Sequence, residues 1–262
     1  MSRPAGKPQA WVAVLAMLLG VALACALGVW QLGRAAQKNQ WQAAQQAQLQ
    51  APALDGAGMA QLLQGQHLPT ATPPAAAMHR PVQLRGQWLA AHTVYLDNRQ
   101  MQGRPGFYVI TPLQLEHGGV VLVQRGWVPR NFEQRQAVVA VDTPGGTVQL
   151  QGRTAAAPAQ LWRMGDGDGV DATQPQIRQN LDLPRFAQDS GLPLWPLTVV
   201  QTGAASEGLL RDWPQPGSGV ATHYGYAFQW FAMAAVLMGM LLWFFVLQPA
   251  RRARQSRQAH VI

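Results

Sequence analysis

Two long stretches of the chain are almost entirely apolar, one near each end of the sequence. Residues 10–32 and residues 224–247 contain no Asp, Glu, Lys or Arg. A helix needs about 20 predominantly apolar residues to cross the hydrocarbon core of a bilayer. Each stretch therefore predicts a membrane-spanning helix, the first at residues 10–32 and the second at residues 223–247.

The first helix is expected to continue beyond the membrane. Residues 32–50, "LGRAAQKNQWQAAQQAQLQ", are rich in Ala and Gln and contain no proline, which favours helix. Pro69, Pro73 and Pro74 then prevent helical continuation. We therefore expect a helical stem and a proline-rich linker over residues 33–80.

The chain between the linker and the second span is predicted to be rich in β-structure. Short segments of β-branched and aromatic residues, partly alternating with polar ones, predict strands. Close-set Gly and Pro turns between them favour antiparallel hairpins. A short helix ending at Gly191 and a late strand complete this pattern. The predicted strands cover residues 82–89, 93–101, 106–115, 119–128, 147–154 and 195–203.

These elements together predict an α+β membrane protein. Two transmembrane helices form a hairpin and flank a mainly antiparallel β domain outside the membrane, at residues 81–222. We expect the sheet to curl into a small barrel or a sandwich, with helices at its edges.

The positive charge of the chain is concentrated outside the two apolar stretches. The net charge is +8, yet residues 33–223 hold 14 of the Lys and Arg residues against all 12 Asp and Glu. Basic residues that flank membrane helices are typical of cytoplasmic segments. Nucleic-acid binding is not predicted, because the chain has no groove motif of interleaved basic and aromatic residues. The other positive residues are Arg3, Lys7, Arg251, Arg252, Arg254 and Arg257.

Orientation depends mainly on the second span. Arg34 and Lys38 balance the two basic residues before the first span, whereas the arginine cluster after the second faces only Arg211. Because the side richer in Lys and Arg stays in the cytoplasm, residues 1–9 and 248–262 are predicted to be cytoplasmic tails. The domain at residues 81–222 then lies on the other side of the membrane.

A cleaved signal peptide is an alternative for the N-terminus. Ala22-Leu23-Ala24 fits the small-residue pattern of a cleavage site, and Cys25 directly follows it. The apolar stretch nevertheless continues through Val29 and Trp30, further than a signal sequence requires. Cys25 is the only cysteine, which excludes an intramolecular disulfide and a thiolate metal cluster.

The domain offers few groups for catalysis. Residues 165–171, "GDGDGVD", partly match a calcium loop but lack the closing Glu, so a solvated turn is favoured. Ser218 lies five residues before His223, but a nucleophile–base pair also needs a third, orienting group. The remaining histidines show no ligand spacing and are expected on the surface; they are His67, His79, His92, His117 and His260. We therefore predict that the chain is not an enzyme.

Four arginines cluster on or beside neighbouring predicted strands, namely Arg99, Arg104, Arg125 and Arg130. They could recognise carboxylates or lipid phosphates, for which the planar guanidinium group is suited. Structural pairing within the domain, for example with Asp97, is the favoured interpretation.

Four sequence segments, in order along the chain, resemble the bacterial type of the Surf1 (Shy1) family. They are "GVWQLGRAAQK" at residues 28–38, "YLDNRQMQGRPGFYVITPL" at 95–113, "VLVQRGWVPR" at 121–130 and "HYGYAFQWFAMAA" at 223–235. Residues 161–179 depart from the pattern, because they lack the Asn- and Trp-containing segment of many relatives.

The resemblance implies an assembly factor, or chaperone, for haem-copper cytochrome c oxidase in respiratory-chain biogenesis. It implies a multi-pass protein of the bacterial inner (cell) membrane with a periplasmic central domain. Its expected partners are the catalytic subunit of the oxidase, membrane lipids and possible haem a synthesis machinery. Its expected cofactor is transiently bound haem a, with His223 as the axial ligand to the iron.

Residue spacing around "HYGYAFQWF", residues 223–231, is compatible with that expectation. In an antiparallel pair, Trp30, Gln31 and Arg34 would lie level with the start of the second span. Tyr226, Ala227 and Trp230 follow His223 at i+3, i+4 and i+7. We expect Ala227 to leave space for a flat ring, Trp230 to stack on it and Arg34 to meet the propionates. Gln31 and Gln229 are polar groups at membrane depth, which favours partners inside the helix pair.

Two other interpretations stay open. An aromatic belt at the membrane interface would also account for this segment, with Gln229 and Gln31 bonded between the helices. In that case the protein is a scaffold that stabilises an oxidase subunit and binds no haem. A haem-modifying enzyme is disfavoured, because the sequence shows no redox metal site.

Overall fold

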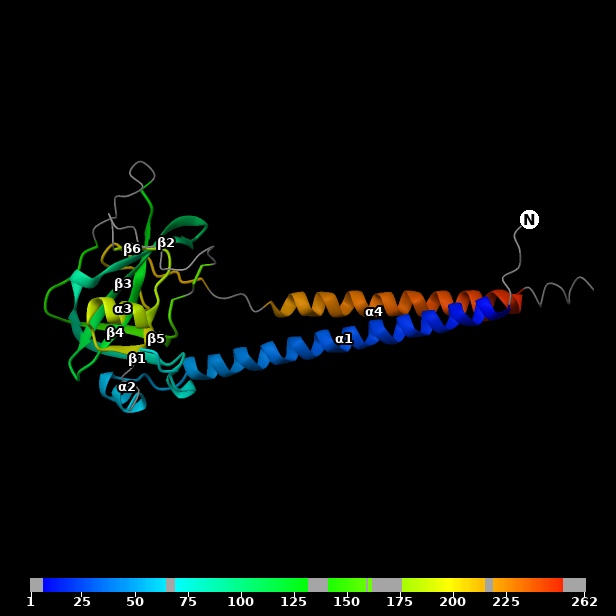
Figure 1. The fold of residues 1–262 in the computed structure, drawn as a ribbon, viewed down its shortest axis with the longest axis horizontal. Coiled ribbons are helices and arrows are strands. Elements are labelled where there is room, and N and C mark those ends of the chain that lie inside the picture. The colour runs from blue at the N-terminus through cyan, green and yellow to red at the C-terminus, as the bar shows by residue number, and fades with distance from the viewer. Residues whose placement is uncertain are drawn as a thin grey trace, which may run out of the picture. The chain divides into compact units, whose positions relative to one another are not determined.

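The computed structural model describes residues 7–64, 69–131, 141–158, 160–161, 176–214 and 219–251. The chain divides into two units, one made of residues 1–43 and 216–262 and the other of residues 44–215. The first unit contains most of α1 (Lys7–Leu49) and all of α4 (Val220–Leu242), which continues into the π-helical η3 (Trp243–Leu247) (Figure 1).

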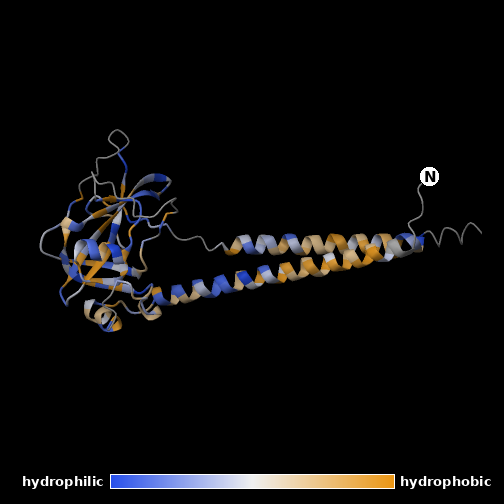
Figure 2. Cartoon of the chain, viewed as in Figure 1, coloured by the Kyte–Doolittle hydropathy of each residue, from blue (hydrophilic) through white to orange (hydrophobic). Residues whose placement is uncertain are grey.

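Both long helices are suited to a membrane. Among the described residues they are the two helices long and apolar enough to cross one, and only 11% and 6% of their apolar windows are buried. Such low burial is unlike a core helix of a water-soluble protein, where most of the window would be covered. Figure 2 shows that α1 is hydrophobic over its N-terminal part and hydrophilic over its C-terminal part.

The end of α1 differs in one respect from the prediction. The helix continues through Leu49, as the Ala- and Gln-rich composition predicts. It then stops before Pro52, far ahead of the prolines from Pro69 onward that were expected to break it. A proline disfavours helical geometry in the residue before it, which accounts for the earlier end. The short helix α2 (Gly56–Leu62) follows and was not predicted; the Asp55 carboxylate accepts the Gly58 N–H at 2.7 Å.

The second unit is built on a sheet that closes into a barrel. The strands run in the order β1-β5-β7-β4-β3-β2-β6, and β1 also pairs with β3, which closes five of them. Most pairs are antiparallel; β4–β7 and β2–β6 are parallel. The strands are β1 (Pro81–Trp88), β2 (Val94–Met101), β3 (Arg104–Leu115), β4 (Val120–Pro129), β5 (Thr147–Ala155), β6 (Ile177–Arg178) and β7 (Leu194–Gln201).

The predicted α+β class and the barrel alternative are therefore confirmed. The predicted short helix is α3 (Leu183–Ser190), and it ends at Gly191 in the left-handed conformation with φ of 66°. Two single helical turns, η1 (Ala75–Ala77) and η2 (Ala90–His92), flank β1.

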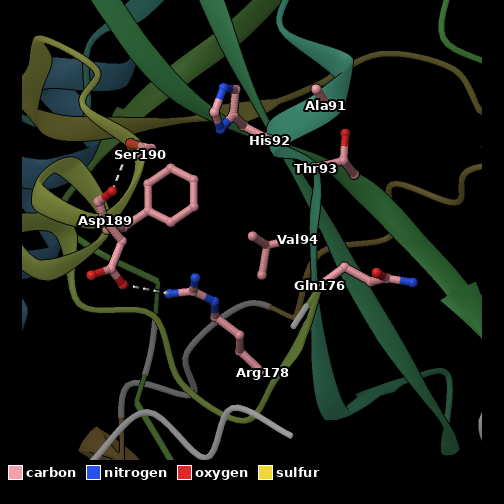
Figure 3. A pocket seen from close by; sticks show the side chains of 9 residues that line it. Ala91, His92, Thr93, Val94, Gln176, Arg178, Asp189 and Ser190 are labelled. Carbon is pink, nitrogen blue, oxygen red and sulfur yellow. Dashed lines mark hydrogen bonds and ion pairs between the residues drawn. The ribbon is translucent and has the colours of Figure 1, made fainter. Parts of the chain in front are cut away.

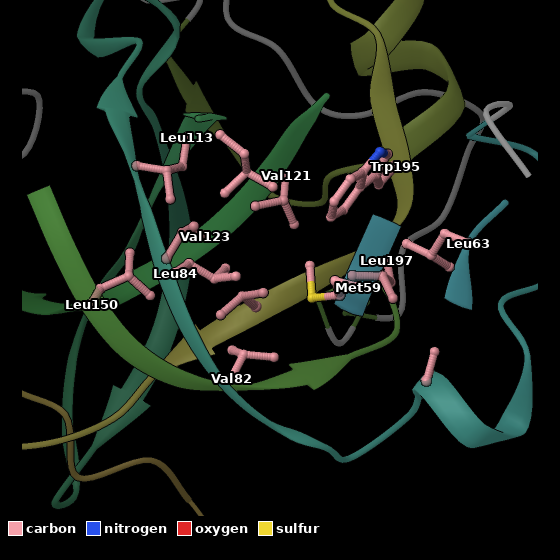
Figure 4. Packing of buried hydrophobic residues seen from close by; sticks show 13 residues of the cluster. Met59, Leu63, Val82, Leu84, Leu113, Val121, Val123, Leu150, Trp195 and Leu197 are labelled. Carbon is pink, nitrogen blue, oxygen red and sulfur yellow. The ribbon is translucent and has the colours of Figure 1, made fainter. Parts of the chain in front are cut away.

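Barrel closure requires a close approach of two strands. Gly86 on β1 lies opposite Leu115 on β3, and a Cβ at Gly86 would lie 2.2 Å from the Gln114 carbonyl oxygen. Glycine removes that clash, so the strands can pair. Inside the barrel the largest core cluster joins α2 to inward-facing residues of β1, β3, β4, β5 and β7 (Figure 4). Labelled members of this cluster include Met59, Leu84, Leu113, Val123, Leu150 and Leu197.

Candidate functional site

The helices α1 and α4 contact each other in antiparallel register. A Cβ at Gly20 would lie 3.3 Å from Leu237, and a Cβ at Gly28 would lie 2.7 Å from the ring of Phe231. From the first contact to the second, the residue number rises on α1 and falls on α4, so the two helices run antiparallel. Small residues at helical spacing are buried on both helices, namely Ala24, Gly28 and Ala35 on α1 and Ala227 and Ala234 on α4.

A polar contact also joins the two helices beside this apolar packing. His223 Nδ1 lies 2.7 Å from Gln31 Oε1, and both side chains are half-buried. An amide oxygen only accepts hydrogen bonds, so in this contact Nδ1–H is the donor, and a neutral ring in this arrangement carries its lone pair on Nε2. His223 and Gln31 were predicted to lie level with each other, and the structure brings them into direct contact.

The other predicted residues of α4 divide between two faces. Trp230 is half-buried, on the side of His223. Tyr226 is 50% exposed and Gln229 is exposed as well, so neither lies in the helix contact. Ala227 is only 2% exposed. The space that Ala227 was expected to leave for a flat ring is therefore filled by protein.

Trp30 and Arg34 lie on the exposed side of α1. The Arg34 guanidinium carbon is 5.5 Å from the centre of the Trp30 ring, and Arg34 Nη1 donates to Gln37 Oε1 at 3.1 Å. Trp30 is 53% exposed. This pair is level with Gln31 but faces away from the helix contact.

A second polar group at the start of α4 was not predicted. Asn39 Nδ2 donates to the Tyr224 hydroxyl at 3.4 Å, and Lys38 Nζ lies 3.0 Å from where a Cβ on Gly219 would stand. Lys38 is half-buried and follows Gln31 by seven residues, so it occupies the same face of α1. That i+7 spacing was readable in the sequence and would have favoured Lys38 over Arg34 as the cation closest to the helix contact.

The arginines of the barrel are engaged within the domain. Arg125 is fully buried and bonds to Glu207 at 2.6 Å, and Arg130 forms an ion pair with Asp97. Arg99 donates to the Gln179 carbonyl at 2.9 Å, and burial lowers its pKa from the ordinary value. Arg104 stacks on Trp127 at 5.6 Å. These contacts therefore support structural pairing within the domain, and not recognition of carboxylates or lipid phosphates.

A pocket in the barrel domain lies between η2, β6 and α3 (Figure 3). Its volume is about 210 Å³, and Arg178 and Asp189 form an ion pair of 3.9 Å along its wall. Pockets for drug-sized ligands measure about 300–1,000 Å³. This pocket is therefore too small for a porphyrin.

Of the remaining metal-site candidates, the structure describes only some. No group of three or more His, Cys, Asp or Glu that could hold a metal ion occurs among the described residues. The calcium-like segment 165–171 and Ser218 lie outside those residues. Cys25 is half-buried in α1 and carries a free thiol.

Comparisons with known proteins give one consistent result. A family model described as the SURF1 family matches residues 18–235. The chain is 25% identical over 231 residues to a SURF1-like protein of Rickettsia felis, covering 86% of this chain and 92% of the relative. It is 24% identical to a SURF1-like protein of Rickettsia bellii, covering 86% and 87% of the two chains. A third SURF1-like protein, from Rickettsia conorii, is 33% identical over 38% of this chain and 37% of its own length.

Proposed function

The chain belongs to the SURF1 family, which supports a general role in oxidase assembly, and from that premise we propose a specific task for its helix pair. The protein binds haem a at the outer face of the membrane and assists its insertion into the catalytic subunit of a haem-copper cytochrome c oxidase. It acts as a chaperone for a cofactor in transit and catalyses no reaction itself.

The contact between His223 and Gln31 is the observation that supports this proposal most. Gln31 Oε1 lies 2.7 Å from Nδ1 of the imidazole, which leaves Nε2 as a donor atom for iron. An outer hydrogen bond of this kind orients metal-binding histidines in many proteins. The residues present therefore suit an axial haem ligand.

The packing restricts where the haem can lie. Because Ala227 is buried, a porphyrin held by His223 would have to lie outside the closed helix contact. Trp230, about two helical turns after His223 on the same side of α4, would then be a stacking partner, and the exposed Tyr226 and Gln229 would line the edge. Haem a would supply the iron and two propionates, and Arg34 beside Trp30 would be the cation to meet them, with Lys38 as a second cation.

The proposal includes a location in the cell. Both termini face the cytoplasm, and the barrel lies in the periplasm of a bacterium with the two helices in the inner membrane. The arginines after Pro249 favour this orientation. A reporter that is active only outside the cytoplasm should be active when fused at Gly146 and inactive when fused after His260. The reverse pattern would exclude this topology.

The haem assignment is tested by purification from cells that make haem a. We expect the wild-type chain to carry a Soret band that His223→Ala abolishes or shifts, while the variant protein accumulates in the membrane to normal levels. His117→Ala is the matched control, because His117 is exposed at the β3–β4 turn of the barrel. Its spectrum should equal that of the wild type.

Two outcomes would contradict the proposal. A wild-type chain without any Soret band would favour the scaffold function, in which the protein stabilises an oxidase subunit and binds no haem. A Soret band that is the same in His223→Ala and in the wild type would exclude His223 as the ligand.

A further inference from the structure

The hydrogen bond between α1 and α4 defines one proton position on His223. A neutral imidazole carries its proton on either Nδ1 or Nε2, and the partner of one nitrogen decides between them. Gln31 places an amide oxygen 2.7 Å from Nδ1. We propose that Gln31 is a positioning residue that holds His223 as the Nδ1–H tautomer, so that the Nε2 lone pair is available before any haem arrives.

Burial of the two groups favours this arrangement. Gln31 lies near the end of the uncharged stretch, and its hydrogen bond with His223 gives two half-buried polar groups a partner that each would otherwise lack. A packing contact between the two helices, Gly28 with Phe231, lies about one turn before Gln31 on α1. That contact fixes the sliding position of the two helices, and with it the separation of the amide from the ring.

Preorganisation of this kind has a consequence for iron binding, and this consequence rests on the proposed function. An outer acceptor on Nδ1–H increases the basicity of the ligand nitrogen and fixes the orientation of the ring. Loss of such a partner typically weakens metal binding by about 10–100-fold. Gln31 thus acts on the haem through His223 and need not touch it.

The first test uses the haem-free, full-length protein in lipid nanodiscs. Histidine is labelled with nitrogen-15, and the His223 signals are identified by subtraction of a His223→Ala spectrum recorded at the same alkaline pH. We expect a protonated Nδ1 and an unprotonated Nε2 in the wild type. In Gln31→Met, which keeps the side-chain length but removes the acceptor, the proton should move to Nε2 in a large part of the population.

Two matched variants accompany this measurement. Gln31→Glu keeps an acceptor oxygen and should retain the Nδ1–H tautomer, which shows that an acceptor is required and not an amide. Gln40→Met makes the same chemical change at an exposed position of α1 and should leave the His223 signals unchanged. An Nε2–H tautomer in the wild type, or identical signals in the wild type and Gln31→Met, would overturn the inference.

A second readout uses the haem-loaded protein. The iron–histidine stretching frequency of the ferrous form should fall in Gln31→Met and rise in Gln31→Glu, because hydrogen bonding at Nδ1 increases electron donation from the ring. The affinity for haem a should fall by about 10–100-fold in Gln31→Met. An unchanged frequency in both variants would refute the positioning role even if haem binds.

The two tests separate this inference from the proposed function. The tautomer is measured without haem, so an Nδ1–H signal that depends on Gln31 supports the inference even if the protein never carries haem a. Conversely, a haem spectrum that depends on His223 but not on Gln31 supports the proposed function and contradicts the inference.

Discussion

The buried ion pair of the barrel allows a sharp test of whether its arginines serve structure or recognition. The Arg125 side chain is fully buried, whereas that of Glu207 is 20% exposed, and the two groups approach to 2.6 Å. Arg125 also donates to Thr143 Oγ1 at 2.8 Å and to the Asp142 carbonyl at 2.7 Å. The substitution Glu207→Gln removes the negative charge, keeps the shape and leaves a buried cation without its counter-ion.

The expected cost follows from this burial. Removing one partner of a fully buried pair typically destabilises a protein by about 3–5 kcal/mol. Glu207 is partly exposed, the Gln oxygen can still accept one hydrogen bond, and the bonds to Thr143 and Asp142 remain. We therefore expect a loss of about 2 kcal/mol in the free energy of unfolding. With a urea dependence of about 2 kcal/mol per molar, the unfolding midpoint should fall by about 1 M.

Urea unfolding of the full-length protein in a mild detergent measures this shift, with tryptophan emission as the probe of the barrel. Glu116→Gln is the control, because its ion pair with Arg85 spans 3.8 Å and the two side chains are 38% and 63% exposed. That pair should contribute about 0–0.5 kcal/mol. Equal midpoints for the two variants would refute the reasoning. They would also reopen the interpretation in which Arg125 binds an anion from outside the domain.

Three further predictions concern the helix pair and the response to acid. Gly28→Leu should separate α1 from α4 and weaken haem a retention, because even a Cβ at Gly28 would meet Phe231 at 2.7 Å. Gly33→Leu is the control and should retain haem a, because Gly33 has open space around it; equal retention by the two variants would contradict the Gly28–Phe231 contact. Burial and the nearby Arg153 lower the pKa of His79 below its ordinary 6.5, so the unfolded chain binds more protons and stability falls as pH drops through 6.5. His79→Asn, which tolerates the φ of 58°, should reduce that loss in urea midpoints measured against pH, whereas parallel curves would exclude it. Arg34→Ala should weaken haem a retention and Arg34→Lys restore only part of it, because Lys lacks the guanidinium fork; full retention in Arg34→Ala would limit Arg34 to anchoring.

The strands of the barrel were predictable because their side chains alternate or form short apolar runs. β1 shows the alternation directly, with Val82 and Leu84 buried and Gln83 and Arg85 exposed. The closing contact of β1 with β3 was not predictable, since it depends on two strands that are not joined by a hairpin. Helix α2 was missed because seven residues are too few for a clear period of 3.6.

The sequence predicts the membrane depth at which the candidate-site residues lie, but not which of them face the partner helix. Antiparallel pairing places His223 level with Gln31 whatever the rotation of the helices. The face turned toward the partner depends on packing of small residues such as Gly28 and Ala227, which one helix alone does not specify. For that reason the spacing grouped Tyr226 with His223, although Tyr226 lies on the exposed side.

Titration of the purified, haem-free chain with haem a tests the central claim most directly. We expect saturable binding at one haem per chain to the wild type, with the absorption signature of a histidine ligand. His223→Ala should lose that signature, while His117→Ala should bind as the wild type does. Binding of equal affinity and equal spectrum in His223→Ala would contradict the claim that His223 holds the iron.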